Sequence, residues 1–196
     1  MYGQALATAL RLHDGREVWM TPLRPDDREE LADAIRHADL DTLFQRFCGA
    51  PPPVTPALLA HLTELDHVRR HALVARDRDG RGVGIGRYEA TGTPHVAEVA
   101  VAVATGWRRV GLGTLLVRRL SDTALRNGFH WFSVTHLPGN RAVARMLCAA
   151  GAVRVAPGGE ARVRCRPWAE AVPPVEFPAG QAWAGRARAG YETPAR

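Results

Sequence analysis

The sequence predicts an α/β (α+β) fold, and three observations support this prediction. Strand-like runs at residues 6–12 and 17–23 flank an Asp14-Gly15 turn, which is a strong signal for a β-hairpin. Helix-like and strand-like patterns then alternate from residue 25 to residue 165. The chain has 196 residues, of which 46% are hydrophobic, so one domain of ordinary size can bury a substantial core.

Three helices are expected in the first third of the chain. Pro25 opens the first, and acidic residues occupy its first turns, where the helix dipole favours them. A second, short helix covers residues 41–47, and the proline-rich run at residues 50–53 interrupts the chain. Thr55 then caps a third helix, whose first residue is Pro56.

The middle of the chain predicts three strands, then a helix and a fourth strand. Strands at residues 71–76 and 83–90 are joined by a turn-rich segment, and residues 95–104 form a longer strand rich in valine. An apolar stripe at helical spacing marks residues 111–127 as a helix, and residues 129–135 as the strand that follows it.

The last predicted elements are a helix at residues 140–150 and strands at residues 152–156 and 160–165. Beyond them the pattern disappears into a segment rich in Pro, Gly, Ala and Arg. These patterns divide the chain into three parts, namely an N-terminal hairpin strand (1–17), a folded domain (18–166) and a C-terminal tail (167–196).

Composition excludes several classes of protein. No run of about 18 apolar residues occurs, and the N-terminus lacks the apolar core of a secretory signal, so we expect no membrane span and a cytoplasmic location. The cysteines, Cys48, Cys148 and Cys165, show no metal-ligand spacing. We expect them to be reduced and mostly packed, Cys148 included, and we expect no bound metal.

The charge of the chain favours an anionic ligand. The formal net charge is +6, and all 26 basic residues are arginine. Such a balance suits an anionic cofactor or an acidic partner. The arginines are scattered, and no recognition motif with interleaved aromatic residues occurs, so nucleic acid is not expected as a partner.

A candidate phosphate site lies where the valine-rich strand meets the next helix. Arg108, Gly111 and Gly113 stand at the start of that helix, where unpaired N–H groups carry partial positive charge. Glycines allow a phosphate to approach these groups closely, and arginine neutralises its charge. The alternatives are a merely tight strand-to-helix connection, or a dinucleotide-binding turn, which would need a third glycine where Leu116 stands.

Two longer stretches resemble the main motifs of the GNAT acetyltransferases. The first is residues 97–103 followed by 107–113, and the second is 138–142, with Gly151 eleven residues after Asn140. The resemblance implies a mixed, mostly antiparallel central sheet that is splayed at an acetyl-CoA site and flanked by helices on both faces. It implies that acetyl-CoA is held by Val101, Ala102, Val103, Arg108, Arg109, Val110, Gly111, Leu112, Gly113, Thr114 and Asn140. Asn140 would also suit the N-cap of its helix.

A closer resemblance concerns the acceptor. Residues 12–16, 23–27, 45–47 and 73–75 resemble the bacterial Pat-type protein lysine acetyltransferases. This implies that the acceptor is a lysine on a partner protein, such as an acyl-CoA synthetase. A chain without lysine of its own offers such an enzyme no competing internal substrate.

Transfer of acetyl to an amine needs a base, because an amine is mostly protonated at neutral pH. Glu98 is the candidate, since a charged side chain within an apolar strand is costly unless it is paired or functional. The alternative is an exposed glutamate paired with an arginine. His136 is a second candidate base.

No general acid is evident in the sequence. Many GNAT enzymes carry a tyrosine seven residues after the asparagine, where this chain has Leu147. We therefore expect direct transfer in a ternary complex, without an acyl-enzyme on Cys148, which lacks an activating partner. The alternatives left open are a small-molecule amine N-acetyltransferase and a non-catalytic acetyl-CoA-binding regulatory module.

Overall fold

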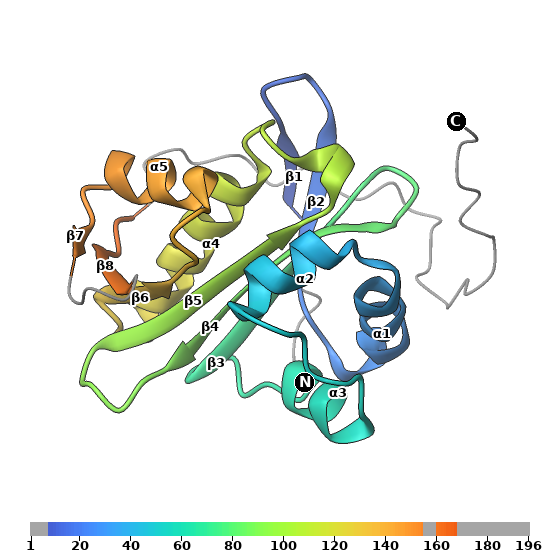
Figure 1. Ribbon diagram of the computed structural model, residues 1–196, viewed down its shortest axis with the longest axis horizontal. Helices are drawn as coiled ribbons and strands as arrows, with labels where there is room; N and C mark the ends of the chain where they lie inside the picture. Colours follow the sequence, from blue (N-terminus) through green and yellow to red (C-terminus); the bar gives the residue numbers. More distant parts are fainter. Residues whose placement is uncertain (1–7, 155–159, 168–196) are drawn as a thin grey trace.

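The computed structural model describes residues 8–154 and 160–167. Its centre is an eight-stranded sheet with the order β1-β2-β3-β4-β5-β6-β8-β7 (Figure 1). Neighbouring strands are antiparallel except for β5 and β6, which run parallel. The prediction of a mixed, mostly antiparallel sheet is therefore confirmed.

The strands are β1 (Thr8–Arg11), β2 (Glu17–Pro22), β3 (Arg70–Arg76), β4 (Gly82–Ala90), β5 (Val96–Val103), β6 (Trp131–Thr135), β7 (Val153–Arg154) and β8 (Glu160–Arg164). The helices are α1 (Arg28–His37), α2 (Leu40–Phe47), α3 (Pro56–Thr63), α4 (Leu112–Arg126) and α5 (Arg141–Ala149), with short 3-10 helices η1 (Pro25–Asp27) and η2 (Thr105–Trp107). Each helix and strand expected from the sequence is present, although several ends shift by a few residues. The start of the strand predicted at 6–12, the end of the strand predicted at 152–156, and the tail after residue 167 lie outside the described residues.

Local sequence signals explain where the helices begin. The Thr55 hydroxyl accepts a hydrogen bond from the Leu58 N–H and caps α3, as predicted. The Asn140 side chain accepts from the Val143 N–H at 3.1 Å and caps α5 in the same way. Asp39 caps α2 by accepting from the Thr42 N–H.

Helices cover both faces of the sheet (Figure 1). α1, α2 and α3 lie over one face, whereas α4 packs on the other, against β3, β4 and β5. Within the described residues, no helix is both long enough and apolar enough to cross a membrane.

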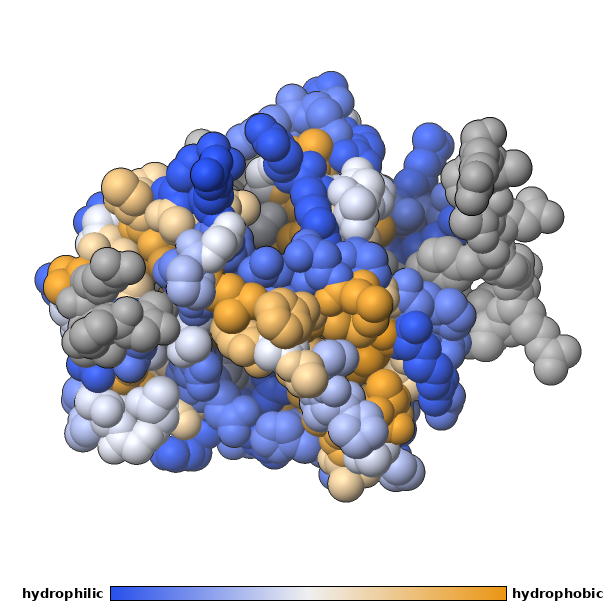
Figure 2. All heavy atoms as spheres, in the orientation of Figure 1, coloured by the Kyte–Doolittle hydropathy of each residue, from blue (hydrophilic) through white to orange (hydrophobic). Residues whose placement is uncertain are grey.

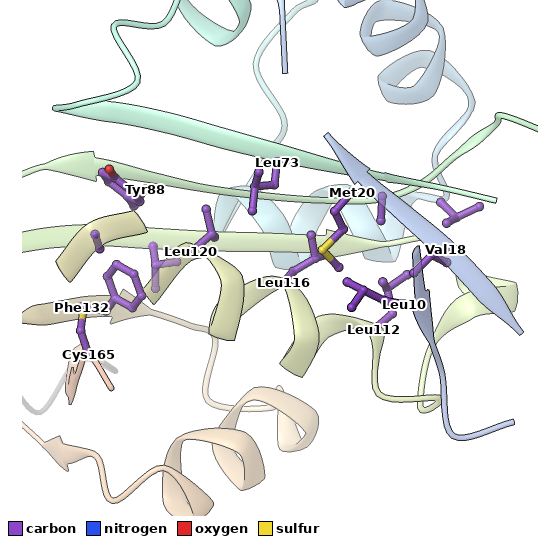
Figure 3. Packing of buried hydrophobic residues seen from close by; sticks show 14 of the residues in the cluster. Leu10, Val18, Met20, Leu73, Tyr88, Leu112, Leu116, Leu120, Phe132 and Cys165 are labelled. Carbon is purple, nitrogen blue, oxygen red and sulfur yellow. The ribbon is translucent and has the colours of Figure 1, made fainter. Parts of the chain in front are cut away.

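The main hydrophobic core lies between α4 and the sheet (Figure 3). Leu112, Leu116 and Leu120 form the buried stripe of α4, at most 1% exposed, and face strand residues such as Tyr88 and Phe132. Gly86 on β4 allows α4 to approach closely, because a Cβ there would lie 2.9 Å from Leu120 Cδ1. This packing fixes the position of the N-terminus of α4 relative to β5.

β5 and β6 pair over only part of their lengths. Their register joins Val96 to Trp131 and ends where Glu98 faces Ser133. β5 then continues to Val103 beside β4, while β6 continues beside β8. The sheet is therefore splayed between β5 and β6, at the place where the resemblance predicted it.

One prediction about the cysteines is wrong. Cys165 is buried and Cys48 is half-buried, as expected, but Cys148 is exposed. The reason is its position on α5, because the neighbouring Leu147 occupies the buried face of that helix. Cysteine at the next position is turned away by about 100° per residue and faces outward.

Candidate active site

The residues predicted to hold a phosphate form a sharp bend before α4. Gly111 has φ of 94° and Arg109 has φ of 66°, both in the left-handed region that glycine adopts most readily. Among the described residues, none accepts a hydrogen bond from the N–H groups of residues 109–114. The bend therefore leaves these N–H groups at the start of α4 available to an anion.

The turn between β1 and β2 packs against this bend. The His13 N–H donates to the Val110 carbonyl at 3.2 Å, and the His13 ring lies 3.1 Å from where a Cβ on Gly111 would stand. Arg16 donates to the Gly106 carbonyl at 3.0 Å and lies 4.0 Å from the centre of the Trp107 ring. Sequence reasoning missed these roles, which join residues about ninety positions apart.

Arg108 faces α2 in the structure. Its Nε donates to the Val103 carbonyl at 3.3 Å, and its Nη2 lies 3.4 Å from Asp39 Oδ2 and also bonds Thr42 Oγ1. Hydrogen bonds from Thr42 lower the pKa of Asp39 to about 2, and the bond from the Thr42 hydroxyl has a larger effect than the bond from its N–H. Arg108 thus ties the end of β5 to the start of α2, whereas Arg109 is exposed.

The open edge of β5 presents backbone groups toward β6. The Ala104 N–H donates to the Val83 carbonyl on β4 at 3.0 Å. Backbone groups alternate between the two edges of a strand, so the N–H and C=O of Val101 and Val103 face the splay. The Ala102 side chain faces the other way from theirs, toward a cavity beneath α1 and α2.

That cavity has a volume of about 450 Å³ and lies between the helices α1 and α2 and the strands β3 to β5. Ala100 and Ala102 of β5 contribute to its floor, and Leu31, Ile35 and Leu43 of the helices to its walls. Its size falls within the range of small-molecule sites.

Glu98 lies on the same face of β5 as Ala100 and Ala102 and lines a second, smaller cavity of about 230 Å³. Five residues line both cavities, namely Arg46, Phe47, Leu62, Arg87 and Ala100. Glu98 is exposed and stands at the last pair of β5 with β6, immediately before the splay. Its carboxylate is therefore near the open backbone edge of β5.

Several charged side chains surround Glu98. Glu89 is directly opposite it on β4, and the Arg87 guanidinium donates to Glu89 at 3.0 Å. The His61 ring lies 3.5 Å from the same Glu89 carboxylate. Burial lowers the pKa of the Arg46 guanidinium, the neighbouring Arg87 lowers it further, and Glu98 raises it. Sequence reasoning did not identify this cluster, which the strand register assembles.

The remaining predicted residues lie at the other side of the splay. Asn140 is at the start of α5, where its side chain is engaged as the cap. Leu147 is buried at 6% exposure, so this position holds a packing residue. His136 follows β6 and its Nδ1 lies 2.9 Å from the Leu137 carbonyl.

Comparison with known proteins places the chain in a family. Residues 33–149 match the Acetyltransferase (GNAT) family, a range that includes β5, the bend and α5. The chain is a GNAT acetyltransferase. A curated relative, the acetyltransferase PA5475 of Pseudomonas aeruginosa, is 38% identical over 145 residues, which cover 72% of this chain and 78% of the relative.

This GNAT acetyltransferase is also similar to Pat proteins. The acetyltransferase Pat of Mycolicibacterium smegmatis is 27% identical over 148 residues, and the match spans 74% of this chain and 44% of that protein. The solved GNAT domain of S. lividans PAT has the same fold, with a TM-score of 0.74 and 24% identity, covering 84% of this chain and 98% of that one.

Proposed function

We propose that the chain is an acetyl-CoA-dependent N-acetyltransferase that transfers acetyl directly to a primary amine, with Glu98 as general base. The observation that carries this proposal is the position of Glu98, which stands at the last pair of β5 with β6, where the β5 edge opens, and lines the smaller of two adjoining cavities. The N–H groups of residues 109–114 suit the pyrophosphate, and the Val101 and Val103 backbone suits the pantetheine arm.

In this mechanism the chain supplies position and a proton acceptor. Glu98 removes a proton from the acceptor ammonium, and the free amine then attacks the thioester carbonyl carbon. The carbon–sulfur bond breaks, coenzyme A leaves as a thiolate, and the nitrogen gives its second proton to water as the amide forms. Leu147 offers no proton, so the thiolate takes one from solvent.

For the acceptor, we propose a lysine side chain of a partner protein. The similarity to Pat proteins supports this acceptor, as does the surface beside the cavities. Figure 2 shows apolar surface over α2, where Leu40 is 79% exposed and Phe44 is 49% exposed. An apolar patch on α2, a helix that lines both cavities, suits contact with a macromolecule better than with a small polar amine.

A small-molecule amine is the second candidate, and the cavity of about 450 Å³ is the observation that favours it. Purified protein and isotope-labelled acetyl-CoA should be supplied with a lysate and, separately, with polyamines, amino acids and aminoglycosides. New acetyl-lysines mapped by mass spectrometry support the protein acceptor. Acetylation of the small amines alone overturns it.

Glu98→Gln tests the base. General-base catalysis accelerates a reaction roughly 10²–10⁴-fold, so we expect kcat of Glu98→Gln to decrease by a factor in that range, while coenzyme A still binds. Glu29→Gln is the control, because Glu29 is an exposed carboxylate on α1, away from both cavities. Unchanged kcat in Glu98→Gln would refute the assignment and favour a different base such as His136. A wild-type chain that binds acetyl-CoA but transfers no acetyl to any of these amines would favour a non-catalytic module.

A further inference from the structure

Two charged side chains in the smaller cavity have opposite signs and lack direct partners. Within the part of the chain that the structure describes, neither Glu98 nor Arg46 makes a hydrogen bond or an ion pair, and the two act on each other only through space. The Arg46 guanidinium instead lies 5.1 Å from the centre of the Phe47 ring, a contact that leaves its N–H donors without an oxygen.

The other charges of this cavity are already engaged. Glu89 receives the Arg87 guanidinium at 3.0 Å and has the His61 ring at 3.5 Å. Arg87 is held at 10% side-chain exposure and is directed to Glu89 along the same strand. The demand left in the cavity is therefore for one cationic group beside Glu98 and one anionic group beside Arg46.

An arginine in this situation is costly unless a ligand compensates it. Guanidinium stays protonated in proteins, and its planar fork of donors fits a carboxylate in a bidentate fashion. Burial lowers the pKa of Arg46, and the Glu98 carboxylate raises it only from a distance, because no ion pair joins the two side chains. The amine of an acceptor satisfies Glu98 but does nothing for Arg46.

We propose that Arg46 binds a carboxylate that the acceptor carries beside its reacting amine, so that the preferred acceptor is a lysine flanked by an acidic side chain. This inference rests on the proposed function and adds a specificity residue to it. The lysine ammonium meets Glu98 and the neighbouring carboxylate meets Arg46, so a flanking positive charge is disfavoured at the same place.

The test uses two synthetic peptides that differ only in the residue next to a single lysine, Glu in one and Gln in the other. We expect kcat/KM of the wild-type chain to favour the Glu peptide by about tenfold, the scale of one charged hydrogen bond. Arg46→Gln should reduce this ratio to about one, mainly through KM of the Glu peptide. Arg46→Lys should retain part of the preference, and the exposed Arg78→Gln should retain all of it.

Three outcomes would overturn the inference. One is a wild-type ratio near one. A second is an equal fall for both peptides in Arg46→Gln, with the acidic limb of the pH profile displaced, which would make Arg46 a residue that only holds Glu98 ionised. The third is a preference for free lysine over lysine amide without any peptide preference, which would move the carboxylate to a small-molecule acceptor. Coenzyme A titration of Arg46→Gln confirms that the variant is folded. The proposed function fails separately, through Glu98→Gln.

Discussion

Gly86 on β4 offers a sharp test of how α4 is held against the sheet. An ideal Cβ at this position would lie 2.9 Å from Leu120 Cδ1 and 3.3 Å from Leu116 Cβ. Both leucines are 0% exposed, so neither has free space to turn into. Gly86→Ala must therefore push α4 away from the sheet or force Leu120 into a poor rotamer.

The expected loss follows from two opposing effects. Overpacking of a dense core costs about 1–3 kcal/mol. Replacing glycine by alanine also restricts the unfolded chain, which returns about 0.4–1 kcal/mol where the backbone conformation is allowed. At the midpoints of these two ranges, the net loss for Gly86→Ala is about 1.3 kcal/mol. Gly92→Ala is the control, because a Cβ there meets nothing within 4 Å, so this variant should be neutral or slightly more stable.

Urea unfolding followed by circular dichroism measures the free energy of unfolding of both variants. In a thermal melt, each kcal/mol lost should lower Tm by roughly 2–4 °C for a chain of this size. Because α4 carries the predicted phosphate-binding N–H groups, Gly86→Ala should also weaken binding of coenzyme A. Equal unfolding free energies for the two variants would refute the packing argument.

Three further predictions concern other parts of the molecule. Burial lowers the pKa of His71 from 6.5 to about 4, so the free energy of unfolding is highest above pH 6.5 and falls by about 3 kcal/mol as pH falls toward 4. Urea unfolding at pH 7 and pH 4.5 should show a smaller loss of this free energy in His71→Phe than in the wild-type chain. Burial raises the pKa of the Cys165 thiol to about 11, whereas Cys148 is exposed, so maleimide at neutral pH should label Cys148 in the folded protein and Cys165 only after denaturation; equal labelling rates would contradict the burial. Arg108→Gln removes the contacts to Val103 and Asp39 and should raise KM for the acceptor by about fivefold, more than KM for acetyl-CoA; the opposite split would favour a phosphate-binding role.

The parts of the fold that depend on short-range signals could be predicted from the sequence. Thr55 and Asn140 predict the starts of their helices, because a cap needs only a side-chain oxygen three residues before a backbone N–H. The Asp14-Gly15 pair predicts its hairpin equally well, because the turn depends only on these neighbouring residues.

The parts that depend on long-range register could not be predicted in the same way. The sequence shows Glu98 as a charge in an apolar strand, but only the pairing of β5 with β4 places it opposite Glu89. Arg46 reaches the same cavity from α2, and no spacing in the sequence relates that helix to β5. The contact of Arg108 with Asp39 could not be predicted either, because it joins the end of β5 to a distant helix. From the sequence alone, an arginine beside two glycines fits a phosphate site equally well.

The early end of the pairing between β5 and β6 has a consequence for the lifetime of the protein. A ligand whose amide groups complete the open edge of β5 binds the folded chain and has no site on the unfolded one. At about one hundred times its Kd, such a ligand adds about 2.7 kcal/mol to the free energy of unfolding. If such a ligand binds, we expect the amount of this protein that survives proteolysis to rise with the concentration of the ligand.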